Sequence, residues 1–206
     1  MDSKTDDQDV CSLMSKVTKR DLLLNSALTL FSEQGIHSTS TASIAKHAGV
    51  ANGTLFHHFD NKQSLVSALY VTSKQQLASA LVLSDDLLSK PLKQQVESLW
   101  HLALDWAISH PCQLIFFQQV ATESALPQAL RIEAMKTELS VLEMMITIGQ
   151  SQNIVVEYPL DLLLDHCQSQ MIASGLFFIN NPLLIANSDY RDNAFNLFWR
   201  AIATDA

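Results

Sequence analysis

Polar side chains recur at helical spacing in a short segment near the N-terminus, and their chemistry suits recognition better than catalysis. The segment offers hydrogen-bond donors and acceptors from Asn52, Thr54, His57 and His58. Its apolar residues, Leu55, Phe56 and Phe59, provide packing positions. A helix of this kind can rest its apolar side on the protein and present its polar side to base edges and phosphates in the major groove of DNA.

The residues just before this segment are those that a helix-turn-helix needs to position it. Ala45 is small at the point where two helices must approach each other, and Gly49 tolerates the positive φ of a tight turn. Val50 follows as an apolar anchor. The pattern therefore predicts two short helices within residues 41–59, with a capped fourth helix beginning after Asn61.

The stretch 24–62 resembles the N-terminal DNA-binding domain of the TetR family of transcriptional regulators. The matching landmarks are Ala27, Leu30, Phe31, Gly35, Thr41, Ile44, Ala45, Ala48, Gly49, Val50, Gly53, Thr54, Leu55, Phe59 and Lys62. The resemblance implies an operator of double-stranded DNA as partner. It also implies that the DNA is contacted by Thr41, Asn52, Gly53, Thr54, His57, His58 and Lys62.

The sequence departs from the family pattern in three ways without removing the motif. Ala42 and Ser43 leave the second helix without a long basic side chain near its start. Phe56 stands where the family usually has a tyrosine, so one possible hydrogen bond to phosphate is absent. Ser64 stands where an acidic residue often completes the capping box of the next helix.

The remainder of the chain predicts an all-α fold. Glycine and proline number only five each, which argues against a turn-rich all-β protein. Apolar periodicity and proline punctuation predict further helices at 16–34, 91–109, 111–124, 127–150, 159–180 and 189–203. We therefore expect a disordered tail at 1–15, a three-helix helix-turn-helix domain at 16–65 and a larger helical domain at 66–206, which by resemblance binds a ligand and dimerises.

The charge distribution and the cysteines indicate the partner and the environment to which the protein is suited. The net charge is -8, yet residues 16–62 hold five Lys or Arg against three acidic side chains, as a DNA-binding module on an acidic body would. The cysteines Cys11, Cys112 and Cys167 are far apart, which favours reduced thiols in a cytoplasm over disulfides or a metal site. We expect no signal peptide, no membrane-spanning segment, no metal and no cofactor.

Large and soft apolar residues in the helical body are candidates to line an effector cavity, although plain core packing is the alternative for each. The candidates are Trp100, Trp106, Phe117 and Met145. His166 and Gln170 share a helix face and are candidate polar anchors, with His101 as a third. No strongly basic cluster occurs, so we expect an apolar or aromatic effector and not a highly anionic one.

The preferred function is a homodimeric repressor that leaves a palindromic operator when a small molecule binds, with dimer contacts through helices near 160–180 and 189–203. One alternative keeps DNA binding but places control in a protein partner. A second alternative is an all-helical enzyme, for which the sequence offers no catalytic motif and no catalytic residue. Glu97, His101 and Asp105 share one helix face, which indicates a solvated stripe or, alternatively, a metal or acid–base site.

Overall fold

The computed structural model describes residues 17–123 and 125–204, and these residues fold into helices without a β-strand. The predicted tail at 1–15 lies outside the described residues. The N-terminal part, which by the resemblance above would bind DNA and is called the DNA-binding end below, holds α1 (Lys19–Gln34), α2 (Thr41–His47), α3 (Asn52–His58) and the start of α4 (Lys62–Ala80). The body adds α5 (Asp85–Leu88), α6 (Leu92–Ser109), α7 (Pro111–Thr122), α8 (Gln128–Glu138), α9 (Ser140–Ser151), α10 (Leu160–Asn180), the 3-10 turn η2 (Pro182–Leu184) and α11 (Ser188–Ile202).

The ends of the N-terminal helices follow from local chemistry. Gly35 ends α1 with a φ of 87°, and its N–H donates to the carbonyl of Phe31. The side chain of Ser40 caps α2, and Gly49 turns the chain toward α3 with a φ of 67°. These two glycines therefore occupy the left-handed region, as the sequence predicted for Gly49.

The capping box before α4 is complete despite the departure at Ser64. The side chain of Asn61 accepts from the N–H of Ser64 at 2.8 Å, and the N–H of Asn61 donates to Ser64 Oγ at 3.2 Å. A hydroxyl thus performs the role that an acidic side chain often has at this position.

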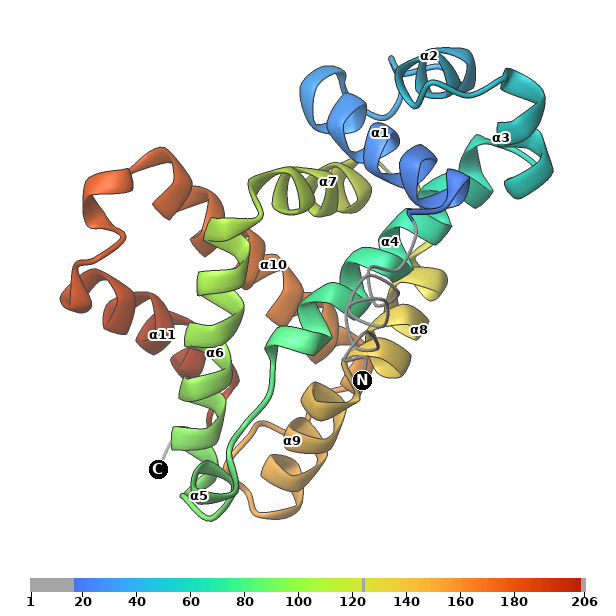
Figure 1. Cartoon of the computed structure of the whole chain (residues 1–206). Helices are drawn as coiled ribbons and strands as arrows, with labels where there is room; N and C mark the ends of the chain where they lie inside the picture. Colours follow the sequence, from blue (N-terminus) through green and yellow to red (C-terminus); the bar gives the residue numbers. More distant parts are fainter. Residues whose placement is uncertain (1–16, 124, 205–206) are drawn as a thin grey trace, which may run out of the picture.

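Figure 1 shows how the two parts of the molecule are joined. α4 begins beside α3 and runs into the body, where α8 packs along it. α7 lies between the body and α1, in contact with α1 on one side and with α6 and α10 on the other. α6 and α10 cross at the centre, and α11 covers both. The DNA-binding end is therefore held by α4, which is continuous with it, and by α7, which only packs against it.

One predicted helix is wrong in its length. The segment predicted as a single helix at 127–150 forms α8 and α9, with a break at Leu139 where φ is -114° and ψ is 43°. Neither proline nor glycine marks the break. The break places the side chain of Leu139, which is only 2% exposed, in the core. The short helix α5, capped by Ser84, was also not predicted.

The polar stripe of α6 joins that helix to α11. Arg191 donates to Asp105 at 2.7 Å, and His101 Nε2 lies 3.8 Å from Asp192. These pairs account for two members of the stripe, and no cluster of metal-ligating side chains occurs at residues 17–123 or 125–204. Within the same ranges, no helix combines the length and apolarity needed to cross a lipid bilayer.

Candidate DNA-binding helix and cavity of the body

The helix α3 has one buried side and one exposed side. Leu55 is fully buried, and Phe59, directly after the helix, is 4% exposed. Asn52, Gly53, His57 and His58 are exposed, and Thr54 is half-buried. Phe56 was predicted to pack inward, and this prediction is wrong, because its side chain is 46% exposed. A row of short polar groups therefore faces solvent on a helix whose opposite side is anchored in the core, which is the arrangement that recognition in a major groove needs.

The other predicted DNA contacts lie at the starts of the neighbouring helices. Thr41 is the first residue of α2 and is half-buried, directly after the capping Ser40. Lys62 is the first residue of α4, and its ammonium donates to the carbonyl of His37 at 3.3 Å. Burial lowers the pKa of Lys62, an effect that the carboxylate of Glu123 opposes. Lys62 therefore already holds the turn between α1 and α2, a role that the sequence did not indicate.

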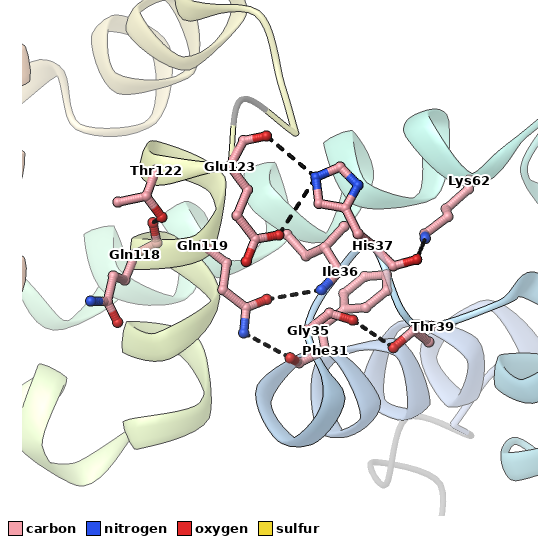
Figure 2. A network of polar contacts seen from close by, with 10 residues as sticks. All are labelled: Phe31, Gly35, Ile36, His37, Thr39, Lys62, Gln118, Gln119, Thr122 and Glu123. Carbon is pink, nitrogen blue, oxygen red and sulfur yellow. Dashed lines mark hydrogen bonds and ion pairs between the residues drawn. The ribbon is translucent and has the colours of Figure 1, made fainter.

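A second feature missed from the sequence is a clamp between α7 and this turn, which Figure 2 shows from close by. The side chain of Gln119 accepts from the N–H of Ile36 at 3.1 Å and donates to the carbonyl of Phe31 at 2.9 Å. The rings of Phe31 and Phe116 stack beside it with centroids 5.9 Å apart. One amide side chain of the body thus makes two hydrogen bonds to the backbone of the DNA-binding end.

The end of α7 adds a second contact to the same turn. His37 Nε2 lies 3.4 Å from the carbonyl oxygen and 3.7 Å from a carboxylate oxygen of Glu123. His37 is exposed, so its pairing with Glu123 is weaker than the bonds of Gln119. Inside the turn, Thr39 is buried and donates to the carbonyl of Gly35 at 2.8 Å.

The body encloses a cavity of about 100 Å³. Side chains of α4, α6, α7, α8, α9, α10 and α11 line it, and almost all of them are apolar. Four residues predicted for an effector site are among them: Trp100, Trp106, Phe117 and Met145. Some large apolar residues of the body therefore do surround open space, and this space lies among the helices named above.

The polar residues at this cavity differ from the predicted anchors. His166 and Gln170 do not line it, and neither does His101. Gln168 does, and because residues two apart on a helix point about 200° apart, His166 and Gln170 turn away from the cavity. The other polar lining residue is Lys74 of α4, which helical periodicity alone had not marked as buried.

Lys74 is 2% exposed and has few partners. Its ammonium donates to Gln168 Oε1 at 2.9 Å, and the same oxygen accepts from the hydroxyl of Tyr70 at 2.9 Å. The nitrogen also lies 4.4 Å from the ring centroid of Phe117 and 5.3 Å from that of Tyr70. Burial, helped by the positive charge of Arg131, lowers the pKa of Lys74 to about 7.

The neighbouring titratable groups do not supply a carboxylate to the cavity. Arg131 lies 3.5 Å from Asp165, and neither residue lines the cavity. Burial raises the pKa of the Cys167 thiol to about 12, so this lining residue carries no charge near neutral pH. Burial also raises the pKa of Tyr70.

Comparisons with known proteins agree with this arrangement. Residues 23–69 match the family model for bacterial regulatory proteins of the tetR family. The transcriptional repressor KstR2 of Rhodococcus jostii is 44% identical over 54 residues, and the match spans 26% of this chain and 26% of that protein. The regulator UidR of Escherichia coli K12 is 39% identical over 57 residues, or 28% of this chain and 29% of UidR.

A solved structure extends the likeness beyond the DNA-binding end. A chain from Shewanella sp. PV-4, described as a tetR family transcription regulator, is 39% identical with a TM-score of 0.84. The alignment covers 91% of this chain and 100% of that one. KstR2 of Rhodococcus jostii and UidR, in contrast, are matched over only about a quarter of their length, so the likeness to these two concerns the helix-turn-helix.

Proposed function

This protein belongs to the TetR family of transcriptional regulators, and we propose that it is a homodimeric repressor released from a palindromic operator by a small, largely apolar molecule. The observation that carries the proposal is the coexistence of an exposed polar face on α3 with a cavity in the body. The chemistry is binding and not catalysis, as in its relatives, which are regulators of transcription. Its place of action is then the cytoplasm, where the operator lies. The reducing environment there would keep both described thiols, Cys112 and Cys167, free.

The DNA contacts that we propose are those of α3 and its flanks. Asn52, Thr54, His57 and His58 would read base edges or phosphates, with Gly53 allowing close approach of the backbone. Thr41 and Lys62 would hold phosphates on either side. Lys62 donates to a carbonyl in the free protein, and an ammonium has three donors, so a phosphate can be added without loss of that bond.

The effector would act through the two helices that reach both sites. Phe117 of α7 lines the cavity, and Gln119 of the same helix clamps the turn between α1 and α2. A ligand that displaces α7 relative to α4 would tilt α3 with respect to the helix of the second subunit. To turn the DNA-competent state from dominant to rare, the ligand must prefer the other state by roughly 5.5 kcal/mol.

The dimer would form through exposed apolar residues of α10 and α11. Phe195, Phe198 and Trp199 face the core, with Phe198 stacked on Trp100 at 4.5 Å. Leu197 is 71% exposed on the opposite side of α11. An exposed leucine on a helix that is otherwise well packed supports the use of this face as the two-fold interface.

Two experiments separate this proposal from control by a protein partner. Operators are first selected from random DNA with the full-length protein, and affinity for the selected sequence is then measured against a panel of apolar and aromatic compounds. We expect at least one compound to lower operator affinity and to protect the body from unfolding. If no compound occupies the cavity or changes affinity, effector control is wrong and the protein-partner alternative gains.

A further inference from the structure

The cavity has one polar region, formed by Lys74 and Gln168, in an otherwise apolar lining. Lys74 is fully enclosed, and the one hydrogen bond that its ammonium makes within the described residues goes to Gln168. An ammonium has three N–H donors, so two of them have no hydrogen-bond acceptor there. Contacts with the faces of Phe117 and Tyr70 offset only part of the cost of burying a charge.

The surrounding charges leave an excess of positive charge when Lys74 is protonated. Arg131 of α8 and Lys74 of α4 contribute two cations, and the positive charge of Arg131 acts on Lys74, whereas the carboxylate of Asp165 on α10 acts on the neighbouring Tyr70. Asp165 is engaged with Arg131. No acidic residue of the described chain lines the cavity.

A second unpaired donor belongs to the same wall. Trp100 lines the cavity and is 4% exposed, and its indole Nε1 is buried without an acceptor in the parts of the chain that the structure describes. Buried donors that lack acceptors are uncommon in folded proteins and call for an explanation. Lys74 and Trp100, which both line the cavity, thus carry donors that lack acceptors within the described chain.

We propose that the cavity takes a ligand with a single carboxylate on a compact apolar body, and that Lys74 binds the carboxylate. The proposal rests on the effector function proposed above and names its ligand class. A carboxylate offers acceptors only, so it matches the free donors of Lys74 without displacing the acceptor Gln168. A cavity of about 100 Å³ has room for on the order of eight to ten non-hydrogen atoms, which matches a medium-chain fatty acid.

The proposed ligand differs in one respect from the apolar or aromatic effector expected from the sequence, because it carries one negative charge. The absence of basic clusters argued against highly anionic effectors, and it does argue against ligands with several negative charges. A single buried lysine in an apolar cavity is enough for one carboxylate, because an ion pair is stronger where water is excluded. Such a site is invisible in the charge pattern of the sequence, since Lys74 stands alone between Ser73 and Gln75.

The test uses octanoate, octan-1-ol and octylamine as probes, with the full-length protein and its Lys74→Met variant, in titration calorimetry. We expect the wild-type protein to bind octanoate about ten- to a hundredfold more tightly than octan-1-ol and to reject octylamine. Lys74→Met should lose this preference while its affinity for octan-1-ol stays within a few-fold. Lys93→Met is the matched control, because Lys93 is exposed on α6 and does not line the cavity.

A second readout needs no variant. At pH 8, above the pKa of about 7 of Lys74, the free site is largely neutral and binding of octanoate should take up a proton. Titrations in buffers of different ionisation enthalpy measure this uptake, which octan-1-ol should not produce. Tyr70 and Cys167 are the titratable neighbours whose ordinary pKa lies closest to pH 8, and burial raises the pKa of Tyr70 and raises that of Cys167 to about 12, so neither should exchange a proton at pH 8.

The outcomes separate this inference from the proposed function. If octan-1-ol binds as tightly as octanoate, if no probe binds, or if octanoate binds without proton uptake, the carboxylate inference is overturned. If octan-1-ol alone binds and releases the operator, the effector function stands and the inference falls. If octanoate binds with the expected preference but leaves operator affinity unchanged, the inference stands and the effector function fails.

Discussion

The clamp made by Gln119 predicts a specific cost for its removal. Methionine has nearly the shape of glutamine without its amide, so Gln119→Met removes both hydrogen bonds and leaves the packing of α7 nearly intact. After the substitution, the two backbone groups differ in whether another hydrogen-bond partner is left to them. The carbonyl of Phe31 still accepts from the N–H of Gly35 at 2.9 Å, whereas the N–H of Ile36 loses its partner.

The magnitude follows from this asymmetry. Ile36 is 3% exposed, and a buried donor left unpaired costs about 1–3 kcal/mol. The bond to Phe31 contributes a further 0.5–1.5 kcal/mol, roughly, because its acceptor keeps another donor. Gln119 itself is half-buried, so water can reach part of the site. We therefore expect the free energy of unfolding to fall by about 2 kcal/mol.

Urea denaturation measures this loss, and Gln118→Met provides a matched control on the exposed side of the same helix. Amide hydrogen exchange should show faster exchange at Ile36 in the Gln119 variant and not in the Gln118 variant. Operator affinity should also fall, because the DNA-binding end is then held by α4 with less support from α7. Equal denaturation midpoints and equal exchange at Ile36 in both variants would refute the clamp.

Four further substitutions test other parts of the argument. Thr54→Ala should weaken binding to a selected operator by about 1–3 kcal/mol and relax preference at one base-pair position, measured by gel shift against single-base operator variants. Lys62→Ala should weaken binding to all sequences alike and reduce the salt dependence by about one ion per half-site; an unchanged slope would remove it from the phosphate contacts. Leu197→Glu should convert a dimer into a 22.9 kDa species in sedimentation while helicity stays constant, and a persistent dimer would place the interface elsewhere. Lys74→Met should raise the free energy of unfolding most below pH 7 and by steadily less as the pH rises from 7 to 10.5, because burial lowers the pKa of Lys74 from its ordinary value of 10.5 to about 7, so that folding of the wild-type protein releases a proton across this range; a difference independent of pH would contradict it.

The DNA-binding end could be predicted from the sequence because its determinants are local. Gly35 and Gly49 mark turns that need positive φ, and the caps before α2 and α4 lie within four residues of the groups that they satisfy. The amphipathic pattern of α3 then predicts which side is exposed, except at Phe56, which was expected to pack and is 46% exposed. Residues whose contacts are close in sequence can be interpreted without knowledge of the rest of the fold.

The body could be predicted only in its helices. The break at Leu139 has no proline or glycine to announce it, and it depends on where the leucine can be buried. The bonds of Gln119 reach more than 80 residues back along the chain, and those of Gln168 reach 94 and 98 residues back. A glutamine on a helix surface looks the same in sequence whether it faces solvent or clamps another domain. The polar residues of the cavity therefore appear only once the helices are placed.

The two proposed sites are connected through α4, on which Lys74 lies, and through α7, whose Phe117 ring Lys74 contacts. Lys62 and Lys74 lie on one helix, about 18 Å apart along its axis, so α4 carries displacement at the cavity directly to the DNA-binding end. Phe117, against which the ammonium of Lys74 rests at 4.4 Å, lies two residues from Gln119 on α7. A carboxylate that draws Lys74 away from this ring would loosen α4 from α7 at the cavity, while Gln119 keeps the far end of α7 fixed to the turn after α1. Because the DNA-binding end is joined to one helix covalently and to the other by the clamp, any relative movement of the two must reorient α3.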